Sequence, residues 1–255
     1  MLTHARDRHA AIGPAPSAMR PKCTASASVA RMLVVHHLNE SRSQRVLWLL
    51  EELGLPYEIK RYQRDPKTML APASLRAVHP LGKSPVVTDG EVVLAESGAI
   101  IEYLIERYGN GRLMPPVGSA ERLRYRYWLH YAEGSAMPPL LLKLVFDRLE
   151  QQPAPFFIKP ILRMVAGQVK RAFIEPQLTL HLDYLEAELG KSTWFAGNEL
   201  TAANIQMSFP LEAARARAGL ASDRPRLLAF LERIHERPAY QRALERGGGY
   251  ALARA

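Results

Sequence analysis

Hydrophobic and polar positions follow two different periods along this chain, and the change falls near residue 109. Before it, short apolar runs typical of strands alternate with helical stripes. Residues 31–38 read as a buried strand, residues 43–53 carry apolar side chains at helical spacing, and residues 57–62 alternate as a second strand. Gly54 stands where a helix C-cap belongs. This stretch therefore predicts a β–α–β unit.

The rest of the first part completes the sheet. Residues 63–83 are rich in Pro and Gly and show no period, which predicts a long loop with one short helix at most. Residues 85–94 hold two apolar runs joined by Asp89–Gly90, a typical two-residue hairpin turn. A helical stripe follows over residues 97–108. The order β–α–β–loop–β–β–α predicts an α/β sheet whose last two strands are antiparallel.

Beyond a Gly- and Pro-rich linker at residues 109–118, nothing resembles a strand. Runs with helical spacing occupy much of the remainder, at residues 120–134, 155–189, 201–218 and 225–244. After the opening 31 residues, the sequence thus predicts an α/β domain at 32–108, the linker, and an all-helical domain at 119–250.

Composition and charge exclude some partners. The 255 residues are 47% hydrophobic, enough for a large core, and no window approaches 18 continuous apolar residues, so we expect no membrane partner. The net charge of +9 is uneven: residues 1–31 hold five basic and one acidic side chain, +4 in total, and the remainder interleaves Arg with Glu. Interleaved charges are typical of solvated helix faces, so we expect no nucleic-acid partner.

The opening residues 1–31 lack the apolar core of a secretory signal and show no period, so we expect a disordered extension. Their Arg- and Ser-rich, acid-poor composition also suits an organelle transit peptide, but the favoured interpretation is an extension upstream of a start at Met32. They contain the sole cysteine, Cys23. The folded part would then have no disulfide, thiolate metal site or cysteine nucleophile, and we expect a cytoplasmic protein.

Two strand ends carry residues that suit a binding site. Ser84–Pro85 precedes an apolar strand. Only about one X–Pro bond in twenty is cis, which favours an ordinary trans strand start, but a cis bond would turn the strand-end amide and carbonyl toward a ligand. Ser97 opens a helix, where serine is most often an N-cap. With Glu96 beside it, the same helix end could instead hold the carboxylate and ammonium of an amino-acid head group.

Ser41 and Ser43 stand at a third corner, between the first strand and the first helix. A hydroxyl at the positive end of a helix can donate to a thiolate and favour its ionised form. Lowering a thiol pKa from about 8.5 to about 6.5 requires about 2.7 kcal/mol, which one charge-assisted hydrogen bond and a helix terminus supply. The nucleophile would then belong to the substrate, and no Ser–His–acid triad is needed.

Three stretches have an order and spacing that are specific when taken together: HHLNESRSQRVLWLLEELGLPYE, HPLGKSPVV and LAESGAIIEYL. A linker and helices follow them. In this order they resemble the cytosolic glutathione transferases, over about residues 32–245. The resemblance implies a thioredoxin-like α/β N-terminal domain that holds glutathione, and an all-α helical-bundle C-terminal domain that supplies most of the electrophile pocket. It further implies glutathione as co-substrate, a hydrophobic small-molecule electrophile, a homodimer and no metal.

Carried over residue by residue, the resemblance makes Pro85 a cis-proline, Val86 the backbone partner of the cysteinyl unit, and Glu96 with Ser97 the γ-glutamyl clamp. Lys83 becomes a partner of the glycine carboxylate, although a solvated loop lysine would look the same. The predicted glutathione-binding residues are Lys83, Ser84, Pro85, Val86, Glu96 and Ser97.

The family uses tyrosine, cysteine or serine as its catalytic residue. His36 stands where the tyrosine would be, and no cysteine lies in the domain. The serine type fits, with Ser41 four residues before Arg45. Ser41 is therefore predicted to hold the thiolate and Ser43 to cap the helix, with Asn39 as a further candidate donor.

Tyr131 and Met137 are the predicted contacts of the electrophile, although such side chains at helical spacing are more often plain core. The favoured function is glutathione transfer to a hydrophobic electrophile, or reduction of a peroxide with the same serine. Two alternatives remain from the sequence: a non-catalytic carrier of apolar ligands, and an interaction module on the same fold.

Overall fold

The computed structural model describes residues 32–254, and the fold given below concerns these residues alone. The predictions made for residues 1–31, Cys23 included, lie outside the described residues. Within the described part, the predicted order of strands and helices up to residue 108 is confirmed.

The N-terminal half contains a four-stranded mixed sheet. Its strands are ordered β2–β1–β3–β4, with β1 parallel to β2 and β3 antiparallel to both β1 and β4. The elements of this half are β1 (Leu33–Leu38), α1 (Ser43–Leu53), β2 (Tyr57–Tyr62), α2 (Ala73–Arg76), β3 (Val86–Asp89), β4 (Val92–Ala95) and α3 (Ser97–Tyr108). The loop at 63–83 holds one short helix, α2, and Gly54 is the left-handed C-cap of α1, as predicted.

The β3–β4 hairpin is present, but its turn is shifted by one residue from the prediction. Asp89 pairs with Val92, so the two turn residues are Gly90 and Glu91. Gly90 has a φ of 62°, the positive value that the first residue of such a turn requires. Asp89 stays in the strand because its carboxylate is buried, where it accepts a hydrogen bond from Tyr103.

No strand follows the linker in the described residues. The helices there are α4 (Ala120–Tyr131), α5 (Met137–Gln151), α6 (Lys159–Val169), α7 (Glu175–Glu188), α8 (Ala202–Arg217), α9 (Pro225–His235) and α10 (Pro238–Gly247), with a short 3₁₀ helix at Ala251–Arg254. The predicted helical runs are confirmed, and α5 is an additional helix for which the sequence predicted no element.

Two π-helical turns join consecutive helices into longer rods. Ala132–Ala136 connects α4 to α5, and Lys170–Ile174 connects α6 to α7. A proline stands two residues after the end of each π turn: Pro138 after the first turn and Pro176 after the second. Proline lacks an N–H, and its ring crowds the carbonyl one turn earlier, so a widened turn accommodates it without ending the helix.

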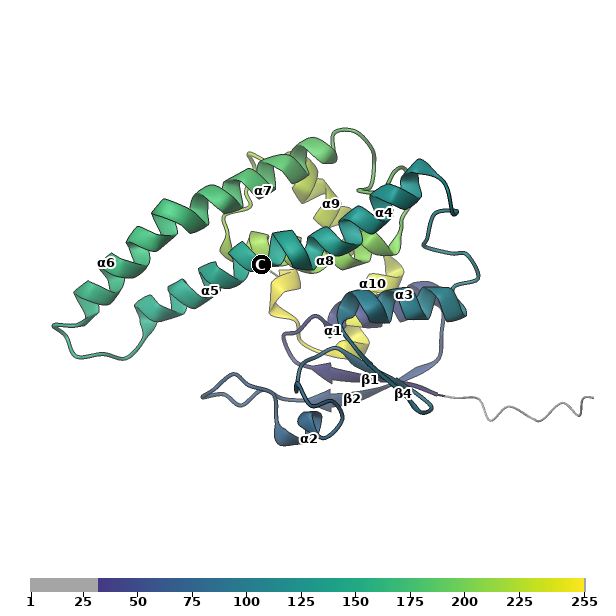
Figure 1. The fold of residues 1–255 in the computed structure, drawn as a ribbon, viewed down its shortest axis with the longest axis horizontal. Coiled ribbons are helices and arrows are strands. Elements are labelled where there is room, and N and C mark those ends of the chain that lie inside the picture. Colours follow the sequence, from purple (N-terminus) through teal and green to yellow (C-terminus); the bar gives the residue numbers. More distant parts are fainter. Residues whose placement is uncertain (1–31, 255) are drawn as a thin grey trace, which may run out of the picture. The chain divides into compact units, whose positions relative to one another are not determined.

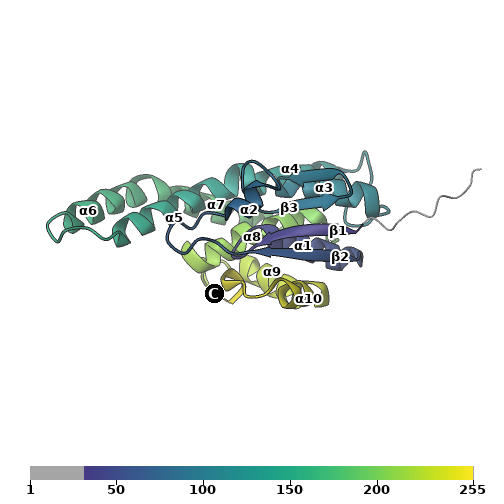
Figure 2. The same ribbon diagram turned by 90° about the horizontal axis from the view of Figure 1, so that it is seen from below.

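The sheet separates two apolar layers. Helices α1 and α3 lie between one face of the sheet and α8, whereas α2 lies on the other face (Figures 1 and 2). Successive side chains of β1 point to opposite faces. Val35 therefore belongs to the large core shared with the helical half, and Leu38 packs with Tyr62 and Leu75 beneath α2.

Helices α5 and α6 form an antiparallel pair that extends away from the sheet (Figure 1). Among the described residues, no helix has both the length and the apolar character needed to cross a membrane.

Candidate active site

The corner between β1 and α1 holds connected hydroxyl and imidazole groups. Ser41 is buried, and its Oγ lies 2.7 Å from Ser43 Oγ and 3.2 Å from Ser84 Oγ. Ser43 Oγ lies 2.8 Å from Nδ1 of His37. Ser41 and Ser84 meet because one follows β1, the other precedes β3, and these strands are antiparallel neighbours. The sheet thus joins two of the predicted site residues that are far apart in the sequence.

His37 is neutral in this corner. Burial lowers the pKa of His37 to about 4, the charge of Arg61 adds to the lowering, and a hydrogen bond with the backbone of Gly247 opposes it. In the tautomer whose protonated ring nitrogen faces the carbonyl of Gly247, Nδ1 is an acceptor, because a carbonyl oxygen only accepts. In that tautomer, Ser43 donates its hydroxyl proton to His37.

The three serine hydroxyls differ in the acceptors to which they donate. Ser84 donates to the carbonyl of His36 at 3.0 Å, and Ser43 donates to His37. Ser41 then donates to a neighbouring serine oxygen. Of the three protons, that of Ser41 alone can turn to a ligand without leaving a carbonyl oxygen or an imidazole nitrogen unpaired.

The predicted cap role of Ser43 is wrong. Helix α1 begins at Ser43, but its N-cap residue is Arg42, whose side chain makes no capping hydrogen bond. Instead, Ser41 Oγ accepts from the backbone N–H of Ser43 at 3.3 Å, while the Ser43 hydroxyl points to the imidazole. Asn39, the further candidate donor, uses its side-chain oxygen to accept from the backbone N–H of Arg64 at 2.8 Å.

The segment before β3 lies against the same corner. The Ser84–Pro85 peptide bond is cis, as the family resemblance implied. Pro85 is buried, and Val86 is the first residue of β3. Lys83 is exposed on the preceding loop. Of these residues, Ser84 contacts Ser41 directly, and the predicted roles of all of them in holding glutathione stay predictions.

Glu96 and Ser97 form the junction between β4 and α3. Glu96 has a φ of 71°, uncommon for a residue other than glycine, and its side chain is exposed. Ser97 is the first residue of α3 and does not cap it. Its buried hydroxyl oxygen accepts from a guanidinium N–H of Arg45 at 3.2 Å. An observed backbone outlier beside a buried serine is typical of a ligand-binding junction.

Two arginines of α1 connect this corner to the helical half. Arg45 is buried and donates to Glu133 and, at 2.6 Å, to the carbonyl of Gln206. Arg42 donates from Nε to both carboxylate oxygens of Glu133 at 3.0 Å. The two guanidinium groups lie 5.1 and 5.3 Å from the ring centroid of Phe209. Burial alone would raise the pKa of Glu133, but the two arginines outweigh it and hold that pKa below its usual value.

The two predicted electrophile contacts have different surroundings. Tyr131 belongs to an aromatic cluster of α4 and α7, where its hydroxyl is hydrogen-bonded to His181. Met137 is buried at the start of α5 and follows Glu133 by about one turn across the π-helical segment, so the two lie on the same side of the rod. Both electrophile roles stay predictions.

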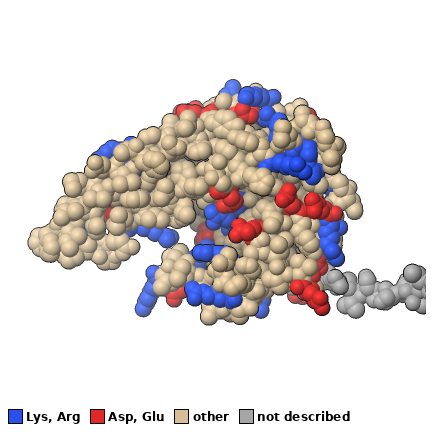
Figure 3. Space-filling model, in the orientation of Figure 1, with Lys and Arg blue, Asp and Glu red and all other residues tan. Residues whose placement is uncertain are grey.

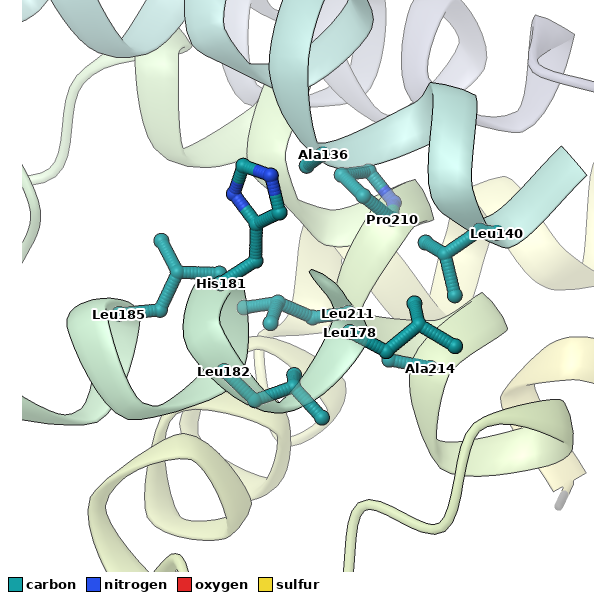
Figure 4. A pocket seen from close by; sticks show the side chains of 9 residues that line it. All are labelled: Ala136, Leu140, Leu178, His181, Leu182, Leu185, Pro210, Leu211 and Ala214. Atoms are coloured by element: carbon teal, nitrogen blue, oxygen red, sulfur yellow. The ribbon is translucent and has the colours of Figure 1, made fainter. Parts of the chain in front are cut away.

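Neither of two cavities contains a predicted site residue. Figure 4 shows a cavity of about 10 Å³ between α5, α7 and α8, room for about one water molecule, with leucine side chains and His181 pointing into it. A hollow of about 460 Å³ lies at the linker, with Leu113, Met114 and Glu199 among its lining residues. In the described part of the chain, no group of three or more His, Cys, Asp and Glu side chains could hold a metal ion.

Sequence reasoning missed several residues that contact this site: His37, Arg42, Glu133 and Phe209. A histidine at a strand end beside two serines is a local signal for His37. Glycine and proline inside a helical run, in AEGSAMPP, indicate an irregular helix, which is frequent at functional sites and marks the neighbourhood of Glu133. No local pattern marks Phe209, because its place opposite α1 depends on how α8 packs.

Comparison with known proteins identifies the family. Residues 41–107 match the model of the glutathione S-transferase N-terminal domain, and residues 169–238 match that of the C-terminal domain. Glutathione S-transferase 3 of Schizosaccharomyces pombe is 37% identical over 84% of this chain and 88% of its own. The chain belongs to the glutathione S-transferase family. Glutathione S-transferase 1 of Saccharomyces cerevisiae is 32% identical over 84% of this chain and 95% of its own.

Solved structures show the glutathione S-transferase fold directly. A glutathione S-transferase from Actinobacillus pleuropneumoniae superposes with a TM-score of 0.72 and 34% identity, covering 88% of this chain and 97% of its own. A glutathione transferase from Phanerochaete chrysosporium with oxidized glutathione shares the fold at a TM-score of 0.68 and 18% identity, covering 87% of this chain and 97% of its own. The predicted thioredoxin-like domain followed by an all-helical domain is thereby confirmed.

Proposed function

We propose that Ser41 donates a hydrogen bond to the sulfur of bound glutathione and holds it as a thiolate for attack on a hydrophobic electrophile. By its family, the protein is a glutathione S-transferase, and glutathione is its co-substrate. The observation that carries the role of Ser41 is the hydrogen-bond pattern in the corner: Ser84 donates to the carbonyl of His36 and Ser43 lies 2.8 Å from Nδ1 of His37, whereas the Ser41 hydroxyl meets only serine oxygens.

The surroundings of Ser41 support a thiolate. Ser41 lies two residues before the first residue of α1, at the end where the helix carries partial positive charge. A hydroxyl donor and a helix N-terminus both favour the ionised form of a thiol. The thiol gives its proton to solvent, and the thiolate then forms a bond from sulfur to the electrophilic carbon. That carbon either loses a leaving group with its bonding electron pair, or gives up a π bond whose electrons pass to the neighbouring atom, which takes a proton from solvent. Ser41 retains its own proton throughout. Relatives named as transferases favour this enzyme over the carrier and the interaction module.

The remaining site residues would hold the rest of the tripeptide. Glu96 and Ser97 suit the ammonium and carboxylate of the γ-glutamyl unit, because they offer a carboxylate and a helix N-terminus side by side. The backbone of Val86 suits the cysteinyl unit, and the exposed Lys83 suits the glycine carboxylate. For the electrophile, we expect contacts from Met137 at the start of α5 and from Tyr131 at the end of α4.

The role of Ser41 is tested by titrating the ultraviolet absorbance of the thiolate of bound glutathione. In the unaltered protein, the bound thiol should have a pKa well below that of free glutathione. Ser41→Ala should raise it by about 1–2 units, the equivalent of one lost charge-assisted hydrogen bond. Asn39→Ala is the matched control and should leave the pKa in place. If Ser41→Ala does not raise the pKa, the proposal is wrong.

We also propose that the protein acts in the cytoplasm as a homodimer. Apolar side chains stand exposed along α4 and α7, among them Leu123, Tyr127, Leu180 and Tyr184. The hydroxyls of Tyr127 and Tyr184 lie 3.0 Å apart, so these two helices present one continuous face. Exposed apolar faces of this kind mark interaction sites. The surface of α5 and α6 in Figure 3 likewise shows few charged side chains.

A further inference from the structure

The Ser97 hydroxyl accepts one hydrogen bond within the fold, but its own proton has no partner among the described residues. Its Oγ is buried and accepts from Arg45, which occupies one side of the oxygen. Its own hydroxyl proton has no acceptor among the described residues, although buried hydroxyl groups normally donate as well. Arg45 is a pure donor, so the proton must point away from it. The Ser97 hydroxyl is therefore free to donate to a ligand at the N-terminus of α3.

Arg45 is held in a single orientation by three separate elements. It is 1% exposed, and its guanidinium donates to Ser97 on α3, to the carbonyl of Gln206 on α8, and to Glu133 in the π-helical turn after α4. The planar guanidinium can serve three acceptors at fixed angles, which a lysine ammonium on a flexible stem cannot reproduce. One of these three hydrogen bonds ends at Ser97, a serine of the predicted clamp.

We propose that Arg45 is a positioning residue for the γ-glutamyl carboxylate of glutathione, acting through Ser97. It directs the Ser97 hydroxyl toward the carboxylate and places a buried positive charge directly behind it. The inference rests on the proposed function only in that glutathione must bind with this carboxylate at the N-terminus of α3. In the sequence, Arg45 stood out only as a neighbour of the catalytic serine. The inference gives it a role at the γ-glutamyl end of glutathione, away from the thiol.

Glu133 sets the strength of this charge. Its carboxylate binds Arg42 as well as Arg45, so it offsets part of the positive charge that Arg45 would present to a ligand. Because Glu133 belongs to the π-helical turn between α4 and α5, the helical half of the protein contributes to a subsite on the sheet-bearing half. A carboxylate bound at Ser97 would interact with Arg45 through the Ser97 hydroxyl, whereas Glu133 contacts the same guanidinium directly.

The test compares two thiols on the full-length protein. One is glutathione, and the other is 4-aminobutyryl-cysteinyl-glycine, which keeps the amine and the thiol but lacks the γ-glutamyl carboxylate. The preference, the ratio of the two dissociation constants, should fall in Arg45→Lys. Glutathione should bind about tenfold more weakly, the size of one lost charge-assisted contact, and the analogue should change by less than about twofold. Equal losses of affinity for both thiols, or no loss, would overturn the inference, because an arginine with a purely structural role would affect the binding of both thiols equally.

A second variant covers the case in which Arg45→Lys does not fold. Glu133→Gln keeps an oxygen acceptor and the side-chain shape but removes the negative charge that offsets Arg45. The preference for glutathione over the analogue should then rise, by about threefold, because the guanidinium faces the ligand carboxylate with less compensation. A fall in the preference would contradict the inference.

Ser41→Ala separates this inference from the proposed function. It should raise the pKa of the bound thiol and leave the preference between the two thiols unchanged. If Ser41→Ala has no effect on the thiol pKa while Arg45→Lys abolishes the preference, the catalytic proposal fails and the role of Arg45 stands. If the thiol pKa responds to Ser41→Ala and the preference does not respond to Arg45→Lys, the reverse holds.

Discussion

Two adjacent histidines at the end of β1 point to opposite faces of the sheet, and each is buried. His36 lies 2.9 Å from the hydroxyl of Tyr62 on the α2 side, and His37 meets Ser43 and Gly247 on the α1 side. Burial lowers the pKa of both. Both rings are therefore neutral near pH 7, and the neutral state of His37 is what fixes the direction of the Ser43 hydroxyl.

The lowered pKa of His37 predicts a loss of stability in mild acid. The folded protein binds a proton at His37 only near pH 4, whereas the unfolded chain binds it from about pH 6.5. The stabilisation is therefore complete above about pH 6.5 and is lost as the pH falls toward 4. Between pH 7 and pH 5, His37 should contribute a loss of about 2 kcal/mol in the free energy of unfolding.

Urea unfolding at several pH values measures this slope. In His37→Gln the change in unfolding free energy between pH 7 and pH 5 should be smaller by about 2 kcal/mol, whatever the variant's stability at pH 7. His36 contributes to the slope in both proteins, so the difference isolates His37. Identical slopes in the two proteins would show that His37 is not buried in a neutral state.

At the scale of elements, α10 packs closely along α1 and fixes the rear of the active-site corner. Glu51 of α1 binds Arg242 and Arg246, and Glu52 binds Arg237 just before α10. Gly247, the last residue of α10, lies against Gln44 and Leu47 of α1 and beside His37. The C-terminal helix therefore supports the histidine that orients the serines.

Glycine at position 247 is needed for this close approach. A Cβ on Gly247 would lie 2.9 Å from Oε1 of Gln44 and from Cδ1 of Leu47, the ends of two buried side chains. These ends must shift, so Gly247→Ala should destabilise the fold by about 1 kcal/mol, the low end of the cost of overpacking. Gly249 has open space around it and no positive φ, so Gly249→Ala should change the stability by less than about 0.5 kcal/mol. Urea unfolding of the two variants gives the comparison. Equal stabilities would mean that α1 and α10 are not in contact at this residue.

The elements themselves show where local patterns suffice. Helix α1 was predicted to its exact bounds, because its apolar stripe and Gly54 are both local features. Helix α5 was not predicted, because two prolines near its start usually end a helix. The π-helical turn that accommodates them cannot be predicted from the hydrophobic pattern. The hairpin turn moved by one residue because burial of Asp89, a tertiary effect, overrode the preference for Asp–Gly in the turn.

For the whole molecule, the exposed apolar face of α4 and α7 leads to a prediction about assembly. Leu123 is 73% exposed on α4, and a charge there should oppose the burial of this face between two copies. Leu123→Glu should therefore be monomeric at micromolar concentration by analytical ultracentrifugation, while the unaltered protein is a dimer. Val117→Glu is the matched control, since Val117 is 88% exposed in the linker and lies outside this face. A dimer that survives Leu123→Glu would place the interface elsewhere.

The sequence by itself determined the order of the elements and the residues at the strand ends, because the period of apolar residues and the chemistry of turns act over a few residues. Ser41, Pro85 and Ser97 could be found in this way. Only the tertiary structure decided which of these side chains meet and which way their protons point. The contacts of Ser41 with Ser84, of Arg45 with Glu133 and of His37 with Gly247 join residues that are distant in sequence, and such pairs depend on how sheet and helices pack rather than on any local pattern.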